Sequence, residues 1–268
     1  MPALPRPETS TVKKLFTRPI RGFLGRFGYE VVRRADPADD PVTYPPDFDD
    51  DLIALCERVR PFTLTSPERI SALRDAVHHV VRAGVPGSIV ECGVWRGGSM
   101  MVVALTLVEL GVDDRDLHLF DTFTHMPFPG EEDVDLFGTP AADVYDVASA
   151  AEAFRYLPLD EVRAALAGTG YPEDRMHFVP GLVEDTIPAS APQAIALCRL
   201  DTDWYRSTLH EMEHLFPRIS PGGVLLIDDY GHFMGAKQAV DEYFAAHGPE
   251  VLLHRIDFTG RLVVVPGR

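Results

Sequence analysis

The sequence is poor in cysteine and in long apolar runs. These shortages argue against a disulfide-bonded or membrane-spanning protein. Its three cysteines, Cys56, Cys92 and Cys198, are odd in number and none stands at the spacing of a metal site, which favours a reducing compartment. No apolar run approaches the roughly 18–20 residues that a membrane-spanning helix needs. The N-terminus also has no apolar core of a secretory signal. We therefore expect a cytoplasmic protein without membrane spans.

Positive charge is scarce too, since 25 Lys and Arg stand against 41 Asp and Glu in the 268 residues, for a net charge of −16. This balance argues against nucleic acid as the main partner. The charge is uneven: residues 1–34 hold eight basic and two acidic side chains, whereas the remainder holds 17 and 39. We therefore divide the chain into a basic N-terminal arm and linker, residues 1–46, and one domain, residues 47–268.

The arm interleaves basic and apolar side chains over residues 12–34. Such a pattern fits an N-terminal helical extension that packs on protein, or peripheral contact with a membrane surface. Pro19, Gly22 and Gly25 weaken a helix there. Because the rest of the chain is strongly acidic, we favour docking on protein over membrane contact.

Apolar strands alternate with helical patterns from residue 49 onward. Strands are expected at residues 88–92, 117–120, 176–180, 194–200, 224–227, 251–256 and 261–265, and helices at 49–60, 67–83, 99–110, 159–167, after Asp203, and at 235–246. Pro221-Gly222-Gly223 should break the chain between a helix and the fifth strand. The order predicts a single doubly wound, Rossmann-like α/β sheet with helices on both faces and an antiparallel C-terminal hairpin.

Two of the expected strands end in acids, Asp201 and Asp203 on one, Asp228 and Asp229 on the other. Open parallel sheets bind ligands beyond the carboxyl ends of their strands, so these side chains should meet there. Four carboxylates in one crevice repel one another and need a cation, and oxygen ligands suit Mg²⁺ or Ca²⁺ better than Zn²⁺. The alternative is that these acids cap helices or lie solvated in loops. Their occurrence after two different strands favours the metal site over this alternative.

A glycine-rich turn, residues 93–98, links the first strand to its helix. Small residues let a backbone approach a ligand, and a helix N-terminus favours a carboxylate or phosphate. The spacing Gly-x-x-x-Gly-Gly speaks against a dinucleotide fingerprint. Asp121 ends the next strand, where an acid can accept hydrogen bonds from both ribose hydroxyls. With the segment 181–185 after the third strand, the turn indicates a cofactor cleft.

The segment 122–156, which we call the acceptor loop, is long and irregular, as a lid or a binding loop would be. Its acidic run, residues 131–135, most simply forms a solvated face. Phe128, Phe137 and Tyr145 are candidates to line an acceptor pocket, because sugar and polyketide faces pack on aromatic rings.

Seven stretches carry a resemblance that covers most of residues 50–268: 63–69 (TLTSPER), 89–100 (IVECGVWRGGSM), 119–127 (LFDTFTHMP), 181–188 (GLVEDTIP), 200–207 (LDTDWYRS), 221–230 (PGGVLLIDDY) and 239–243 (AVDEY). They resemble the macrocin O-methyltransferase family, whose members methylate sugar hydroxyls of macrolides and the aminocoumarin phenol. The resemblance implies a class I methyltransferase sheet, S-adenosylmethionine and Mg²⁺ as cofactors, and a homo-oligomer.

The resemblance also assigns roles to residues. Metal ligands are implied for Asp201, Asp228 and Asp229, and Asp203, beside the catalytic Asp201, matches the proton acceptor of some members. Other members place a His one position later, where this chain has Trp204. Cofactor-binding positions are implied around the methionine part (Glu91, Gly93, Ser99), the ribose (Asp121) and the adenine end (Gly181, Glu184, Asp185).

We therefore expect methyl transfer to a hydroxyl of a small-molecule or glycoside acceptor. A metal that binds two neighbouring hydroxyls lowers the pKa of one, and Asp203 takes the proton. A catechol would suit the same geometry as a vicinal diol, so a phenol- or catechol-type O-methyltransferase is the alternative. A non-catalytic binding protein is disfavoured by the intact acids and glycine-rich turn.

Overall fold

The computed structural model describes residues 43–144 and 158–267. The chain divides into two units, Met1–Pro46 and Asp47–Arg268, and the second carries the sheet. The expected N-terminal helical extension and the end of the acceptor loop, with Tyr145, lie outside the described residues. Within the described ranges, no helix combines the length and apolar character needed to cross a bilayer.

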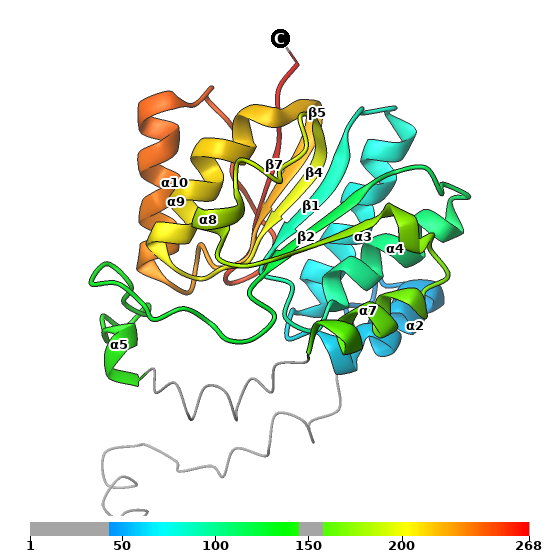
Figure 1. The fold of residues 1–268 in the computed structure, drawn as a ribbon, viewed down its shortest axis with the longest axis horizontal. Helices are drawn as coiled ribbons and strands as arrows, with labels where there is room; N and C mark the ends of the chain where they lie inside the picture. Colours follow the sequence, from blue (N-terminus) through cyan, green and yellow to red (C-terminus); the bar gives the residue numbers. More distant parts are fainter. Residues whose placement is uncertain (1–42, 145–157, 268) are drawn as a thin grey trace, which may run out of the picture. The chain divides into compact units, whose positions relative to one another are not determined.

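A seven-stranded sheet forms the centre of the second unit, in the order β3-β2-β1-β4-β5-β7-β6 (Figure 1). Its strands are β1 (Ser88–Cys92), β2 (Leu117–Asp121), β3 (Met176–Pro180), β4 (Ile195–Leu200), β5 (Ile219–Ile227), β6 (His254–Arg255) and β7 (Arg261–Val264). Strands β1 to β5 pair in parallel, and β7 runs antiparallel to both β5 and β6. The doubly wound class with an antiparallel C-terminal hairpin is confirmed.

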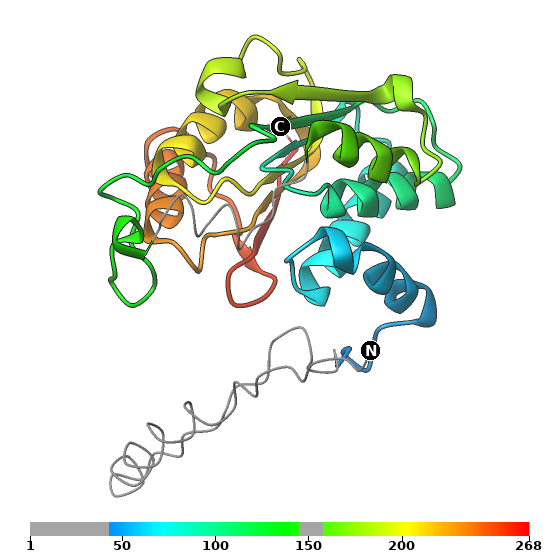
Figure 2. The same ribbon diagram turned by 60° about the horizontal axis from the view of Figure 1, so that its bottom comes forward.

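Helices cover both faces of the sheet (Figures 1 and 2). One layer holds α2 (Asp50–Val59), α3 (Pro67–Arg82), α4 (Gly98–Glu109) and α7 (Leu159–Ala167), and the other holds α8 (Val183–Thr186), α9 (Tyr205–Leu215) and α10 (Met234–His247). The short α5 (Ala141–Val144) lies in the acceptor loop. Because β1 to β5 run parallel, their carboxyl ends all lie at the same edge of the sheet.

Helix α3 begins as its sequence predicts. The Ser66 side chain accepts a hydrogen bond from the Arg69 amide at 3.2 Å, and Pro67 takes the first helical position, where no amide is needed. Its apolar face is buried (Ile70, Leu73, Val77 and Val80). This start places the Arg69 side chain at the carboxyl edge of the sheet.

Two expected boundaries are wrong. Pro221-Gly222-Gly223 does not end a helix but lies inside β5, where the pairing with β4 shifts register. Gly222 has φ +80°, and a Cβ on Gly223 would lie 2.8 Å from the Ala196 carbonyl oxygen, so glycine lets the strand bulge and continue. The strand expected at 251–256 shrinks to β6 because it pairs at the sheet edge only with β7.

Candidate active site

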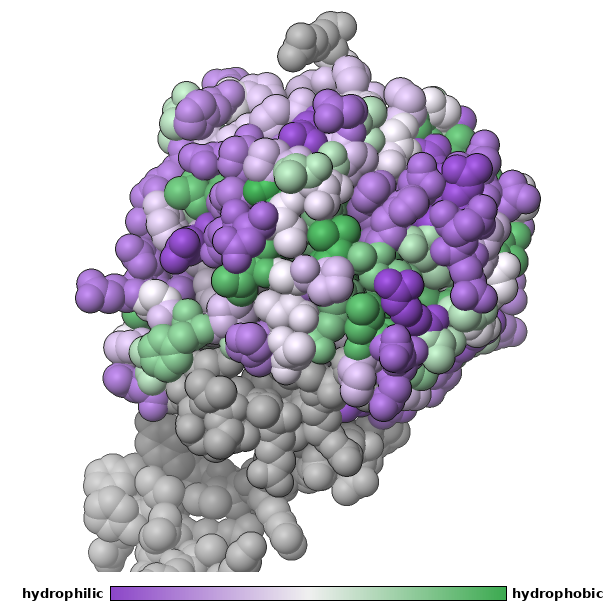
Figure 3. All heavy atoms as spheres, in the orientation of Figure 1, coloured by the Kyte–Doolittle hydropathy of each residue, from purple (hydrophilic) through white to green (hydrophobic). Residues whose placement is uncertain are grey.

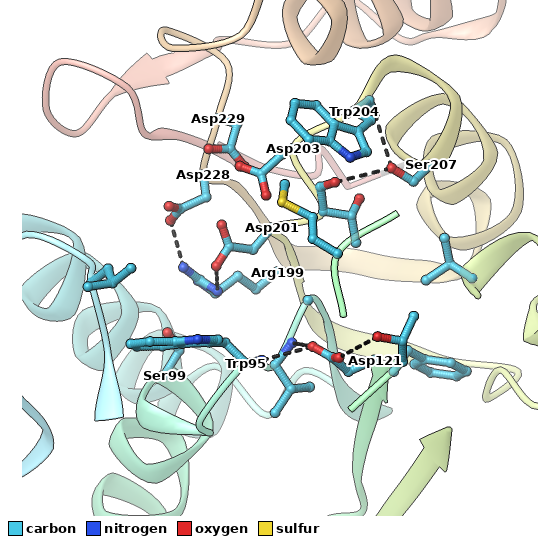
Figure 4. Close-up of a pocket in the computed structure, with 18 of the residues that line it drawn as sticks. Trp95, Ser99, Asp121, Arg199, Asp201, Asp203, Trp204, Ser207, Asp228 and Asp229 are labelled. Carbon is cyan, nitrogen blue, oxygen red and sulfur yellow. Dashed lines mark hydrogen bonds and ion pairs between the residues drawn. The ribbon is translucent and has the colours of Figure 1, made fainter. Parts of the chain in front are cut away.

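A cavity of about 620 Å³ opens at the carboxyl ends of β1, β2, β4 and β5, where open α/β sheets bind ligands (Figure 4). Figure 3 shows the surface of the same unit in the orientation of Figure 1, with apolar and polar side chains interspersed. Most of the residues singled out in the sequence line the cavity: Gly93, Ser99, Asp121, Gly181, Glu184, Asp201, Asp203, Asp228 and Asp229. Glu91 and Asp185 are not among the lining residues.

Backbone strain is concentrated at this cavity. Among the described residues, the non-glycine residues with positive φ are Trp95 (49°), Phe123 (53°) and Asp203 (65°). They follow β1, β2 and β4, respectively, and Trp95 and Asp203 line the cavity. Such conformations persist only where the surroundings enforce them, and they gather at functional sites.

The glycine-rich turn is packed tightly on its neighbours. A Cβ on Gly93 would lie 1.9 Å from the carbonyl oxygen of Asp201, and one on Gly98 would lie 2.5 Å from that of Phe62. Helix α4 starts directly after the turn, and its N-cap, Gly97, offers no side-chain hydrogen bond. Gly98 and Ser99, the first two residues of α4, line the cavity, and the N-terminus of a helix favours a carboxylate or phosphate.

Asp121 holds this turn in place. Its Oδ2 accepts hydrogen bonds from the amides of Val94 (2.7 Å) and Trp95 (2.8 Å), and its Oδ1 accepts one from Phe123 (2.6 Å). Burial raises the pKa of Asp121, and these amides oppose the rise. The carboxylate therefore fixes the shape of the glycine-rich turn at the cavity, a task beyond the ribose contact expected from the sequence.

The acids after β4 and β5 do come together. Carboxylate oxygens of Asp201, Asp228 and Asp229 lie within 4.8 Å of one another, and Asp203 lines the same cavity. Burial is the largest cause of the raised pKa values of Asp201, Asp203 and Asp229, and repulsion from neighbouring carboxylates adds to it.

Two arginines partly neutralise this cluster. Arg199, on β4 and 5% exposed, donates to Asp201 at 2.7 Å, to Asp228 at 2.7 Å and to Glu91 at 2.8 Å. The other oxygen of Asp228 pairs with Arg69. Figure 4 shows Arg199 lying between Asp201 and Asp228. Neither arginine is predicted as a site residue from the sequence, although Arg199 is the one charged residue in the apolar strand β4.

Glu91 contacts the site through Arg199. Its carboxyl is 1% exposed, and burial raises its pKa to about 7 although Arg199 opposes the rise. Its Oε2 is buried without a hydrogen-bond partner among the described residues. The structure thus places Glu91 behind the cavity wall, as support for the guanidinium that orients Asp201 and Asp228.

The acid cluster fits a hard divalent cation. Its donors are oxygens, and Asp229 Oδ2 is buried with no hydrogen-bond partner in the described part of the chain. An unpaired buried carboxylate oxygen is costly, and a cation beside it would lower the raised pKa values. Asp201, Asp228 and Asp229 are the residues that could hold such an ion.

Part of the cavity wall comes from the acceptor loop (Thr122, His125, Met126, Pro127 and Ala141) and part from Trp204 and Phe233. Trp204, 5% exposed, donates from Nε1 to the carbonyl oxygen of Pro127 at 2.8 Å and packs edge-on against Phe233 at 4.9 Å between ring centroids. Phe128 and Phe137 are 63% and 84% exposed and are not among the lining residues.

One expectation for the acceptor loop holds for Glu131 and Glu132, which are exposed, and is wrong for Asp133. The acidic run 131–135 was expected to be solvated, but Asp133 is only 1% exposed. Its carboxylate accepts hydrogen bonds from two backbone amides, those of Gly130 and Tyr205, each at 2.7 Å. A charge run read by composition alone does not reveal which member folds inward.

Comparison with known proteins gives concordant matches. The family model described as Macrocin-O-methyltransferase (TylF) matches residues 55–263. The 8-demethyl-8-(2,3-dimethoxy-alpha-L-rhamnosyl)-tetracenomycin-C 4'-O-methyltransferase of Streptomyces olivaceus is 35% identical over 198 residues, 74% of this chain and 73% of that protein. Mycinamicin III 3''-O-methyltransferase of Micromonospora griseorubida is 32% identical over 200 residues, 74% and 76% of the two chains. The structure of the O-methyltransferase NovP is similar with a TM-score of 0.66 at 30% identity, covering 77% of this chain and 83% of that one.

Proposed function

Because the chain belongs to the macrocin O-methyltransferase family, we propose that it transfers a methyl group from S-adenosylmethionine to a hydroxyl of a sugar on a natural product or glycoconjugate, with Mg²⁺ at the acceptor. The observation that carries the proposal is the convergence of Asp201, Asp228 and Asp229 at a cavity that also borders the glycine-rich turn. The chain is an O-methyltransferase, and the proposal adds a metal, roles for its residues and a class of acceptor.

The cofactor side is suited to S-adenosylmethionine, which supplies an electrophilic methyl group on a sulfonium. The first amides of α4 and Ser99 receive the carboxylate of the methionine part near Gly93. Asp121 faces the ribose while it holds the turn, and the segment after β3, with Gly181, Glu184 and Asp185, takes the adenine end. Glu91 does not line the cavity and contacts the site through Arg199, whose guanidinium binds Asp201 and Asp228 on the acid side.

The acid side is suited to activating a hydroxyl. Mg²⁺ held by Asp201, Asp228 and Asp229 would supply a Lewis acid that lowers the pKa of a bound hydroxyl. Arg199 fixes the orientation of Asp201 and Asp228 by donating a hydrogen bond to each carboxylate. Asp203 is the proton acceptor: it lines the cavity two residues after Asp201, and its strained backbone, with φ 65°, is of the kind that gathers at functional sites.

The acceptor is a sugar with an apolar body attached. The tetracenomycin and mycinamicin relatives are named for methylation of a rhamnosyl 4' position and of a mycinamicin 3'' position. The mouth of the cavity carries exposed apolar side chains, Leu64 (69%) and Leu182 (37%), which suit an apolar aglycone better than water. A homo-oligomer in the cytoplasm remains part of the proposal.

A panel of acceptors tests this proposal. The purified enzyme is incubated with S-adenosylmethionine, Mg²⁺ and either rhamnosides of apolar aglycones or catechols. The masses of the products are then measured by mass spectrometry. We expect a single added methyl group on the rhamnosides. Methylation of catechols alone would overturn the sugar assignment in favour of a phenol-type enzyme.

A further inference from the structure

The described part of the acceptor loop is fastened to the two segments that carry the acid cluster. Over residues 127–141, the loop contacts the start of α9 through the bond from Trp204 Nε1 to the Pro127 carbonyl oxygen. It contacts the start of α10 through the bond from the Met234 amide to the Val134 carbonyl oxygen, 2.9 Å. Helix α9 follows Asp203 in the chain, and α10 follows Asp229. In Figure 1 the loop and α5 lie beside the start of α10.

Asp133 is the central point of this attachment. Its Oδ2 accepts from the Gly130 amide within the loop, and its Oδ1 accepts from the amide of Tyr205, the first residue of α9, both at 2.7 Å. Its own carbonyl oxygen accepts from the Ala141 amide at 2.7 Å, at the start of α5. The N-cap of α9, Trp204, offers no side-chain hydrogen bond. Asp133 therefore caps α9 from a distant part of the chain.

The Asp133 carboxylate also lies so close to the start of α10 that no side chain fits at position 235. A Cβ on Gly235, in the first turn of α10, would lie 2.0 Å from Asp133 Oδ1 and 3.1 Å from the Tyr205 Cβ. Gly235 has no positive φ that would require glycine. The missing side chain is instead what allows the loop, α9 and α10 to meet at one buried carboxylate.

We propose that Asp133 is a positioning residue, which holds the acceptor-side wall in fixed relation to Asp203 and to the acids that follow β5. This inference rests on the proposed function, in which Asp203 is the base and the loop faces the acceptor. His125 and Pro127 of the loop line the cavity together with Asp203. A shift of the loop against α9 changes where the acceptor hydroxyl lies relative to the base.

A shift of the acceptor loop should not change the geometry of the cofactor side. Its turn is held by a separate carboxylate, Asp121, through amides at 2.6–2.8 Å. Loss of the Asp133 contact should therefore raise the KM for the acceptor and lower kcat, and leave the affinity for S-adenosylmethionine unchanged. A residue that merely stabilised the whole fold would not divide the two substrates in this way.

The first test compares Asp133→Asn with Glu132→Gln, the same chemical change at the neighbouring, exposed acid of the loop. An amide nitrogen at position 133 cannot accept from a backbone amide, so one of the two contacts is lost. We expect Asp133→Asn to reduce kcat/KM for the acceptor by about tenfold to a hundredfold, as small misplacements of a reacting group do. Its dissociation constant for S-adenosylmethionine, measured by calorimetry, should equal that of wild type and of Glu132→Gln.

A second pair removes the contact from the other partner. Tyr205→Pro eliminates the amide that Asp133 accepts from, at the first helical position where proline is tolerated, whereas Tyr205→Ala keeps the amide and loses the same side chain. The difference between the two variants reports the contact itself. In amide hydrogen exchange without substrate, Tyr205→Pro and Asp133→Asn should speed exchange in residues 127–141 relative to their controls.

Two results would overturn the inference. One is unchanged exchange in residues 127–141 with an unchanged acceptor KM in both Asp133→Asn and Tyr205→Pro. The other is an equal loss of cofactor affinity and acceptor affinity, the mark of a general folding role. If the wild-type enzyme methylates no glycoside at all, the proposed function fails, and the exchange measurements still decide whether Asp133 couples the loop to α9.

Discussion

The two sides of the cavity hold their buried carboxylates by different means. On the cofactor side, Asp121 is satisfied by three backbone amides at 2.6–2.8 Å. On the acid side, Asp228 is held by two guanidinium groups, while Asp229 keeps one buried oxygen without a partner among the described residues. Amides leave the charge in place and fix the shape of a turn, whereas arginines cancel part of a larger charge.

This difference indicates which side is complete in the protein alone. The turn on the cofactor side is preformed, because three backbone amides of the chain already hold the Asp121 carboxylate. The acid side has more carboxylates than the two arginines neutralise, and burial with mutual repulsion raises the pKa values of Asp201, Asp203 and Asp229. A cation is the group that would complete it.

The largest effect should follow from removing Asp229, whose buried Oδ2 has no hydrogen-bond partner among the described residues. We expect Asp229→Asn to abolish measurable Mg²⁺ binding and to lower turnover on the order of 10⁴-fold, because metal activation supplies several kcal/mol. Calorimetric titration with Mg²⁺ and single-turnover rates provide the measurement. Wild-type Mg²⁺ affinity in this variant would remove Asp229 from the ligand set.

Replacing the proposed base should separate proton transfer from metal binding. Asp203→Asn should lower kcat by about 10²–10⁴-fold, the range for a lost general base, and leave Mg²⁺ and S-adenosylmethionine affinities near wild type. Stopped assays at saturating acceptor measure kcat, and calorimetry measures both affinities. If Mg²⁺ binding disappears, Asp203 is a ligand and the roles given to it and to Asp201 are wrong.

On the cofactor side, Asp121→Ala should act through the turn. Three amides lose their acceptor, each worth about 1 kcal/mol or more when buried, so the dissociation constant for S-adenosylmethionine should rise by about 10- to 100-fold. Mg²⁺ affinity should not change. An equal loss of affinity for S-adenosylmethionine and for Mg²⁺ would mean that the two sides of the cavity do not form independently. That result would contradict the difference described between them.

A smaller effect is expected where the acceptor loop meets α9. Trp204→Phe keeps a ring against Phe233 and removes the indole donor to the Pro127 carbonyl oxygen. The loss of one hydrogen bond, about 1 kcal/mol, should raise the acceptor KM roughly fivefold. Steady-state kinetics with varied acceptor measure this, and a changed cofactor KM instead would contradict the division into two sides.

The smallest effect on chemistry should come from the N-terminal arm. Deleting residues 1–46 removes a segment of positive net charge from a strongly acidic chain. We expect loss of the oligomer on sizing, or a raised acceptor KM with unchanged cofactor affinity. An enzyme unchanged in size and kinetics that only stops sedimenting with anionic vesicles would favour the membrane alternative.

The sequence predicts the fold well because its strands and helices carry strong local signals. Strands such as β1 and β3 coincide with their apolar runs, and α3 with its Ser-Pro-Glu start. The bulge at Gly222 is harder to foresee, since Pro-Gly-Gly usually ends an element and only the register of the neighbouring strand shows that β5 continues.

The site is predicted only in part, because ion pairs depend on tertiary placement. The acids at the ends of β4 and β5 follow from topology, as parallel strands end at one edge. The partners of those acids do not follow: Arg199 lies within its strand, and Arg69 comes from α3, far away in sequence. Likewise, nothing local distinguishes the buried Asp133 from the exposed Glu132.

The most direct test of the proposed mechanism is methyl transfer to a rhamnoside acceptor by chelator-treated enzyme, with and without added Mg²⁺, at saturating S-adenosylmethionine. If the cluster of Asp201, Asp228 and Asp229 exists to hold an activating cation, product should form only when Mg²⁺ is restored, whereas S-adenosylmethionine should bind in both conditions. Full activity in the metal-free enzyme would contradict the mechanism, because the acids would then be balanced by Arg69 and Arg199 alone.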